Sequence, residues 1–424
     1  MRLSSSVAIM AWRLGVATAG VVDMPLRRAV SPDNTCGTNG IGGTSNAYTC
    51  PANLPCCSVN GFCGSTDAYC LASGGCQSAF GTCNTMATGG GTLTGGSGIL
   101  GGECGPGKGS CGATECCSLA GFCGNGPDFC RAPDCQFNFG PACDANAIPA
   151  GTNTSTIPRT KLGSVLYGSS GIYDCSFAGD VALTFDDGPY IFTGKILDLL
   201  KQYNASATFF VTGNNNGKGQ IDSASTPWPA LVRRMFDENH QIASHTWSHA
   251  DLCTITSTQR MNEMYKNEMA IRNVVGSIPT YMRPPYSSCN AGRLICISEI
   301  STITDMKIEC GCEADMEALG YHVTYFDLDT SDYLNDSPQL ISNSQTIFDN
   351  ALTSKSPATD DFLVIAHDIH NQTSEVLVEH MLKGLTSKGY RPVTIGQCLG
   401  DDKANWYRTD TATTLGNRDE CEVD

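Results

Sequence analysis

Two short apolar runs in the second half of the chain predict buried strands that end in ionisable side chains. Residues 180–185 are mostly apolar and favour a strand, and a Gly-Pro pair stops this strand just after Asp186 and Asp187. Residues 363–366 form a second apolar run, which ends in His367. We therefore expect two carboxylates at the end of one strand and an imidazole at the exit of another.

A pair of histidines adds candidate metal ligands. His245 and His249 stand four positions apart, which places both imidazoles on one face if the backbone between them is helical. Two histidines and one carboxylate commonly hold a catalytic divalent metal and leave positions open for water and substrate. The acid pair alone would indicate a turn, and the His pair alone a helix surface or core pair. Together with Asp186 and Asp187, the His pair predicts a metal site.

A rigid loop and a proton-transfer group complete a hydrolytic pattern. Residues 283–286 read Arg-Pro-Pro-Tyr, so two prolines restrict a loop that carries a permanent cation. His367, at the exit of its strand, is placed to transfer a proton near neutral pH.

The first third of the chain lacks such runs and repeats itself. Eight cysteines lie in residues 34–83 and eight more in residues 103–143, and the stretch 56–64 matches the stretch 116–124. Segments of this length cannot bury enough apolar surface to fold alone, so disulfides must hold each module. Two linkers rich in Gly, Thr and Ser follow the modules, at residues 84–102 and 144–171. They predict that the modules move independently of the globular part, residues 172–410. A polar tail follows at residues 411–424.

The composition indicates that the protein folds in an oxidising compartment and that its partner is not a nucleic acid. The 24 cysteines predict a secreted protein, extracellular or in the cell wall, and residues 1–22 predict a signal peptide although Arg13 interrupts its apolar run. The net charge of −16 argues against nucleic acid, and no apolar run is long enough for a membrane span. We expect a monomer. Four sequons fit a secreted glycoprotein: Asn153, Asn204, Asn335 and Asn371.

Each cysteine-rich module resembles the hevein-like chitin-binding module. The resemblance implies these disulfides: Cys36–Cys57, Cys50–Cys63, Cys56–Cys70, Cys76–Cys83, Cys104–Cys117, Cys111–Cys123, Cys116–Cys130 and Cys135–Cys143. It also implies sugar-binding residues, namely stacking aromatics and a serine hydroxyl in each module: Ser58, Phe62, Tyr69, Ser118, Phe122 and Phe129. Asn60 and Ala120 stand where plant relatives have a further aromatic, so we expect each site to bind sugar more weakly. Two weak sites on one chain can still give avidity on a polymer. The alternative is that the modules are purely structural.

The globular part resembles the polysaccharide deacetylase family of carbohydrate esterases. Five segments carry the resemblance in the family's order, and the second is similar to fungal chitin deacetylases: residues 184–189, 244–249, 283–286, 329–333 and 363–367. The resemblance implies a distorted (β/α) barrel and a Cys175–Cys398 disulfide. Tyr333 stands where many bacterial relatives have Trp.

The same resemblance implies a role for each site residue. Zn²⁺, or Co²⁺, is held by Asp187, His245 and His249, polarises an acetamide carbonyl and lowers the pKa of a bound water. Asp186 acts as general base with Arg283 as its partner, and the backbone N–H of Tyr286 holds the oxyanion. His367 acts as general acid, and Asp332 sets its tautomer and raises its pKa.

These residues imply a secreted, metal-dependent hydrolase that removes N-acetyl groups from chitin and chitin oligomers and is anchored to chitin by its modules. Two alternatives remain open: a deacetylase of another acetylated polysaccharide, and a lectin-like chitin-binding protein with little or no activity. Residues 292–311 depart from the family pattern. We interpret them as an intron read through in frame, against the alternative of a genuine loop, and a spliced transcript that lacks them would support the intron.

Overall fold

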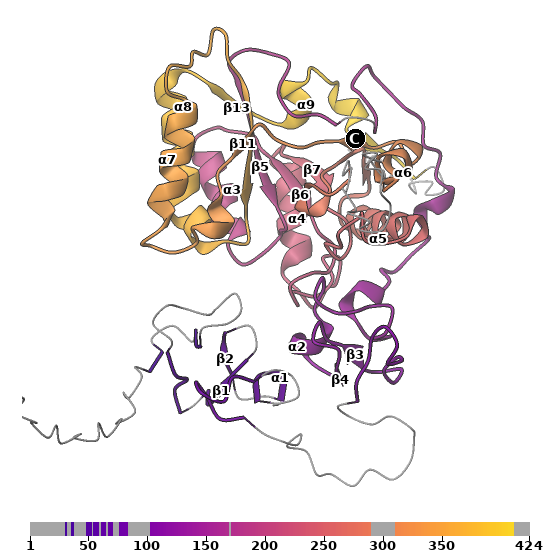
Figure 1. Cartoon of the computed structure of the whole chain (residues 1–424). Helices are drawn as coiled ribbons and strands as arrows, with labels where there is room; N and C mark the ends of the chain where they lie inside the picture. Colours follow the sequence, from indigo (N-terminus) through magenta and orange to yellow (C-terminus); the bar gives the residue numbers. More distant parts are fainter. Residues whose placement is uncertain are drawn as a thin grey trace, which may run out of the picture. The chain divides into compact units, whose positions relative to one another are not determined.

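The computed structural model describes residues 30–31, 35–37, 48–52, 54–58, 61–64, 67–70, 76–83, 102–168, 171–289 and 310–410. These residues belong to two compact units, Met1–Thr94 and Gly95–Asp424 (Figure 1). The predicted signal peptide, the polar tail, nearly all of the first linker and nearly all of residues 292–311 lie outside the described residues.

Each cysteine-rich module is a two-stranded antiparallel ribbon followed by one helical turn. The first contains β1 (Cys56–Cys57), β2 (Cys63–Gly64) and α1 (Asp67–Cys70), and the second contains β3 (Cys116–Cys117), β4 (Cys123–Gly124) and α2 (Pro127–Cys130). Buried cysteines form the core of both modules. The disulfides in the two modules coincide with the eight pairs that the resemblance implies.

A parallel sheet forms the centre of the globular part, which is a distorted (β/α) barrel. Its eight strands are β5 (Asp180–Asp186), β6 (Thr208–Val211), β7 (Gln241–Ser244), β9 (Tyr281–Met282), β10 (His322–Val323), β11 (Leu328–Asp329), β12 (Phe362–His367) and β13 (Arg391–Val393). The order is β10-β9-β7-β6-β5-β12-β11, and β13 also pairs with β5. β5 is buried along its whole length, as continuous apolar runs in parallel sheets are. Because β5 and β12 pair with Asp186 opposite His367, the two predicted strand ends meet at one edge.

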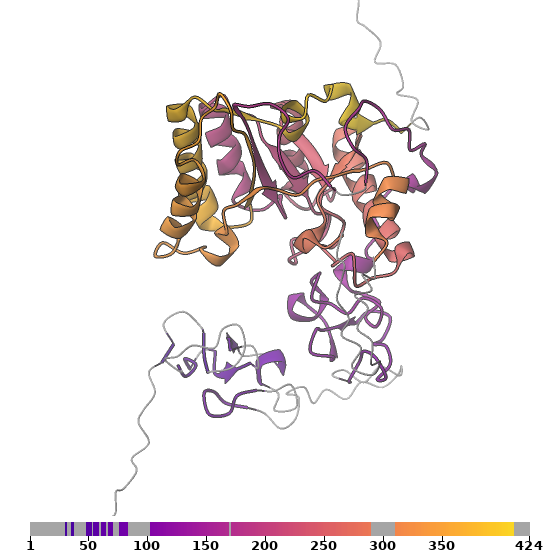
Figure 2. The same ribbon diagram turned by 45° about the horizontal axis from the view of Figure 1, so that its top comes forward.

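Helices cover the outside of these strands (Figure 1, Figure 2). They are α3 (Thr193–Gln202), α4 (Trp228–Asp237), α5 (Ser257–Val275), α6 (Cys312–Ala318), α7 (Ile341–Ala351), α8 (Val378–Lys388) and α9 (Ile395–Cys398). The longest, α5, begins with a capping box of Thr256 and Gln259 and ends at Gly276, whose φ of 77° a residue without Cβ adopts freely. A short antiparallel pair joins β8 (Ile278–Pro279) to β14 (Tyr407–Arg408).

The segment after the second module is ordered on the globular part, which the composition did not predict. Residues 144–168 contain two 3-10 turns, η2 (Asp144–Asn146) and η3 (Thr154–Thr156), and Thr154 is fully buried. Arg159 binds Glu268 of α5 through both terminal nitrogens, at 2.5 and 2.9 Å. The prediction of a mechanically independent linker is therefore wrong for residues 144–168, because polar side chains of α5 hold the segment.

Within the described residues, three disulfides fasten the globular part. Cys175–Cys398, the pair that the resemblance implies, joins the chain before β5 to α9 across a separation of 223 residues. In the chain-entropy account, closing so long a loop stabilises the fold by about 5 kcal/mol. Cys289–Cys312 joins the residues on either side of 290–309, and Cys253–Cys310 ties the far side of that segment to the chain before α5. The Cys253–Cys310 pair was not predicted from the sequence, and the intron interpretation of residues 292–311 stays a prediction.

Candidate active site

The predicted ligands come from two loops at the carboxyl edge of the sheet. Asp187 directly follows β5, and His245 directly follows β7. The backbone from His245 to His249 is not helical, since Thr246 and His249 have φ values of 69° and 61°. The two residues therefore do not share a helix face, but the loop still brings their rings within 5.0 Å, centroid to centroid.

The side chains of Asp187, His245 and His249 converge as ligands of one metal ion would. Asp187 Oδ1 lies 3.1 Å from His249 Nε2 and 3.5 Å from His245 Nε2. One ligand atom from each residue lies within 4.8 Å of the others. Asp187 Oδ1 is buried, and among the described residues it accepts no hydrogen bond. A cation fits between these three electron-pair donors, and two nitrogens with one carboxylate oxygen suit Zn²⁺.

The tautomer of His245 supports the same arrangement. Its Nδ1 lies 2.7 Å from the carbonyl oxygen of Arg283, which can only accept, so Nδ1 carries the hydrogen and Nε2 the lone pair. Burial lowers the pKa of His245 to about 4, so the ring is neutral at physiological pH. A neutral imidazole is the form that binds a metal.

Asp186 and Arg283 form a buried ion pair beside this cluster. Arg283 Nη1 donates to Asp186 Oδ1 at 2.7 Å, and the two side chains are 1% and 2% exposed. Arg283 is itself held by Thr184 Oγ1, by the carbonyl of Tyr325 and by the ring of Phe210. The other carboxylate oxygen, Asp186 Oδ2, lies 3.7 Å from His245 Nε2 and so faces the cluster. Arg283 therefore holds Oδ1 of Asp186, while Oδ2 points toward the Asp187, His245 and His249 cluster.

His367 and Asp332 form a second pair at the end of β12. His367 Nδ1 donates to Asp332 Oδ1 at 2.7 Å, and Asp332 Oδ2 accepts from Thr373 Oγ1 at 2.6 Å. Burial alone would lower the pKa of His367, but the charge and hydrogen bond of Asp332 outweigh it and raise this pKa to about 10. His367 therefore holds a proton at neutral pH. Tyr333, the residue that departs from the family pattern, lies edge-on to His367 with ring centroids 5.4 Å apart.

Tyr286 lies at the rim of the site. It belongs to the 3-10 turn η4 (Pro285–Ser287), its φ is 57°, and its ring is 62% exposed. The ring lies 4.6 Å from that of His249, edge to face. The residue therefore lies close enough to the ligand cluster to contact a bound substrate.

Three buried polar residues that the sequence reasoning missed hold the loops of the site. Glu263 of α5 accepts hydrogen bonds from the backbone N–H and the hydroxyl of Ser248, both at 2.7 Å. Asn267, one turn later, donates to the carbonyl of Val211 at the end of β6. Lys218 donates to the carbonyl of Asp187 at 2.9 Å, and burial lowers its pKa to about 7. The sequence offered one signal for Glu263 and Asn267, because polar residues on the buried face of a helix need polar partners.

The predicted sugar-binding residues of the second module lie close together, but not all are open. Ser118 is buried, and its Oγ already accepts a hydrogen bond from Phe122 N at 3.2 Å. The ring of Phe129 covers Gly124, where an added Cβ would approach it to 2.6 Å, so this packing requires glycine. The first module repeats these contacts with Ser58, Phe62, Tyr69 and Gly64. Their assigned role in binding sugar stays a prediction.

Comparisons with known proteins agree with this geometry. Residues 176–296 match the family model described as polysaccharide deacetylase. The chain is 40% identical over 270 residues to a chitin deacetylase of Colletotrichum lindemuthianum, covering 64% of this chain and 97% of the relative. A chitin deacetylase of Pestalotiopsis sp is 38% identical over 263 residues, covering 62% of this chain and 78% of the relative. The solved structure of the Colletotrichum lindemuthianum enzyme aligns with a TM-score of 0.51, over 57% of this chain and 97% of that one.

Proposed function

Since the chain belongs to the polysaccharide deacetylase family and is a deacetylase, we propose that it removes N-acetyl groups from chitin in a metal-dependent reaction. One observation carries the proposal. The Asp187, His245 and His249 cluster, the Asp186–Arg283 pair and the His367–Asp332 pair meet at one edge of the sheet. Amide hydrolysis needs these three functions: an electrophile, a base and an acid.

The base function falls to Asp186. When bound at Asp187, His245 and His249, Zn²⁺ or Co²⁺ supplies a Lewis acid for the acetamide carbonyl. Asp186 Oδ2 takes a proton from the attacking water, while Arg283 holds Oδ1 and keeps the carboxylate oriented. Because the carboxylate is already oriented, the activation free energy includes little entropy cost for positioning it.

The acid function falls to His367. It is protonated at neutral pH, and Asp332 fixes its ring through Nδ1, so Nε2–H is the group that donates to the leaving amine. The proposal also assigns the backbone N–H of Tyr286 to the oxyanion, since the ring of this residue lies beside that of His249. The products are acetate and a glucosamine unit.

We expect Asp332→Asn to move the alkaline limb of the kcat–pH profile to lower pH by about 1 to 3 units. The Asp332 charge raises the pKa of His367, and the protonated ring is the active acid. Without the charge, the ring loses its proton at lower pH. Thr373→Val, which removes a hydrogen bond to Asp332 but keeps the charge, is the control and should shift the limb far less. An alkaline limb that stays in place in Asp332→Asn would contradict the assignment of His367.

Chitin as the substrate is tested by acetate release. We expect acetate from chitin oligomers at a kcat/KM well above that from acetylated xylan oligomers of equal length. Faster release from xylan would favour the alternative of another acetylated polysaccharide. Release from neither, by protein that holds its metal, would favour the lectin-like alternative.

The first module is proposed as a chitin anchor. A chain that starts at residue 102 lacks this module, and we expect it to bind insoluble chitin at least about tenfold less well while hydrolysing short soluble oligomers at the full rate. A pull-down on chitin and an acetate assay measure the two effects. A chain that starts after Asn153 also loses the contacts of η2 and the second module, and we expect it to lose activity on the oligomers as well. Equal activity in both truncations would argue against that second expectation.

Secretion is proposed from the cysteine pairing. The described residues contain eleven disulfides, which form in oxidising compartments. Among the described residues, no helix combines the length and apolar character needed to cross a membrane. Three of the four sequons are exposed, whereas Asn335 is buried and its Nδ2 donates to Ser331 and Ser344, so the folded state favours the unmodified side chain there.

A further inference from the structure

The second module contacts the catalytic domain directly. Asn216 N donates to the carbonyl of Ala132 at 2.8 Å, and Gln259 Nε2, at the start of α5, donates to Asn138 Oδ1 at 2.7 Å. Just after the module, Asn214 Nδ2 and Lys266 Nζ bind the carbonyls of residues 144 and 145 at 3.0 and 2.7 Å. These bonds come from two separate elements of the catalytic domain, so they fix the module at more than one point.

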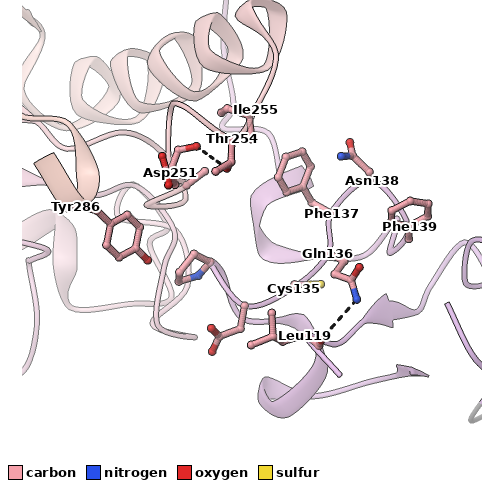
Figure 3. Close-up of a pocket in the computed structure, with 13 residues that line it drawn as sticks. Leu119, Cys135, Gln136, Phe137, Asn138, Phe139, Asp251, Thr254, Ile255 and Tyr286 are labelled. Atoms are coloured by element: carbon pink, nitrogen blue, oxygen red, sulfur yellow. Dashed lines mark hydrogen bonds between the residues drawn. The ribbon is translucent and has the colours of Figure 1, made fainter. Parts of the chain in front are cut away.

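A hollow of about 540 Å³ lies between the module and the catalytic domain. Leu119, Gln136 and Phe137 line it from the module, and Thr254, Ile255 and Tyr286 line it from the catalytic domain (Figure 3). Its volume falls within the range of roughly 300 to 1,000 Å³ that is typical of sites for small organic ligands. The hollow is therefore large enough for sugar units.

The hollow leads to the active site through Tyr286. This ring lines the hollow and also lies 4.6 Å from the ring of His249, one of the three converging ligands. Tyr286 thus borders both the hollow and the ligand cluster, so a polymer with one unit at the cluster can extend toward the hollow.

The lining suits an uncharged sugar chain. Leu119, which is 66% exposed, and Phe137 offer apolar surface for the faces of sugar rings. Gln136 Nε2 and Thr254 Oγ1 already donate to backbone carbonyls, so Gln136 Oε1 and Thr254 Oγ1 remain as acceptors for sugar hydroxyls and amide N–H groups. The two carboxylates of the lining already have partners, since Asp134 pairs with Arg131 and Asp251 accepts from Ser288 Oγ. An uncharged sugar chain can therefore bind there through its ring faces, hydroxyls and acetamides, without a basic group.

We propose that this hollow is a composite subsite which binds the N-acetylglucosamine chain next to the unit being deacetylated. The inference rests on the proposed function and makes the second module part of the substrate-binding groove. It is separate from the sugar-binding face expected from the resemblance, since Ser118, Phe122 and Phe129 are not among the lining residues.

The test compares a hexamer of N-acetylglucosamine with a dimer, using the full chain. We expect Leu119→Ser to raise KM for the hexamer roughly fivefold, because apolar contact is lost, with kcat and the kinetics on the dimer unchanged. Val59→Ser changes the matching sequence position of the first module and serves as the control, with no expected effect on either KM. An unchanged hexamer KM in Leu119→Ser, or an equal loss on both oligomers, would overturn the subsite.

A binding measurement separates this proposal from the proposed function. In a full chain that carries Asp186→Asn, we expect calorimetry to show hexamer binding about fivefold weaker when Leu119→Ser is added, and unchanged when Val59→Ser is added. Equal hexamer affinity with and without Leu119→Ser contradicts the subsite even if the enzyme is active. Wild-type protein that releases no acetate contradicts the proposed function, while the calorimetric difference still decides on the subsite.

Discussion

Asp186→Asn is expected to lower kcat on chitin oligomers by about 10³-fold while the protein still binds its metal. Asparagine keeps an oxygen that can accept from Arg283 Nη1, but the side chain can no longer take a proton from water. We expect the metal cluster to stay intact, because the carboxylate proposed as its ligand is Asp187. Acetate release measures the loss, and elemental analysis of the purified variant measures bound metal.

The activity of Asp186→Asn must be compared with that of the wild type at a temperature below the melting temperature of the variant. Arg283 is 1% exposed, so loss of the Asp186 charge leaves a buried cation without its counter-ion and destabilises the fold by about 3 to 5 kcal/mol. A melting curve identifies the usable range. If the folded variant had lost its metal, the roles of Asp186 and Asp187 would have to be exchanged.

His249→Ala is expected to lower metal affinity by more than about 100-fold and to remove nearly all activity at low metal concentration. Changes to groups that only support a ligand already cost about 10- to 100-fold in affinity, and loss of a ligand costs more. His249 is partly exposed on a loop, so its truncation leaves no large buried cavity and the fold should persist. Calorimetric titration with Zn²⁺ measures the metal affinity, and acetate release at each Zn²⁺ concentration measures the activity.

His380→Ala is the matched control. His380 lies on α8 and pairs with Asp349, away from the cluster. We expect wild-type metal binding and wild-type activity in this variant. If His249→Ala bound metal as tightly as His380→Ala does, His249 would not be a ligand.

The chemistry at the strand ends could be predicted from the sequence because it is local. Asp186, Asp187 and His367 each follow an apolar run, and the run fixes where the strand stops and which side chain comes next. That β5 pairs with β12, which brings these ends together, is seen only in the structure. The geometry between His245 and His249 was not predictable in this way, because a spacing of four fits both a helix and a loop with residues at positive φ.

Contacts between domains could not be read from the sequence. Residues 144–168 have the composition of a flexible linker, yet Glu268 and Lys266 of α5 hold them through charged and polar bonds. Such contacts follow no period, so they leave no pattern in a single chain. The same reason explains why the docking of the second module through Asn138 and Gln259 was missed. The Cys253–Cys310 disulfide was equally hidden, since spacing alone does not choose among cysteine pairings.

We propose that this chain deacetylates chitin with a metal held by Asp187, His245 and His249. The most direct measurement follows acetate and free amine during incubation of the purified full chain with a chitin hexamer, before chelation, after chelation, and after Zn²⁺ is restored. We expect one acetate for each amine exposed, loss of both signals on chelation and recovery with Zn²⁺. Undiminished release from protein shown to be free of metal, or no release from protein that holds one ion at this cluster, would contradict it.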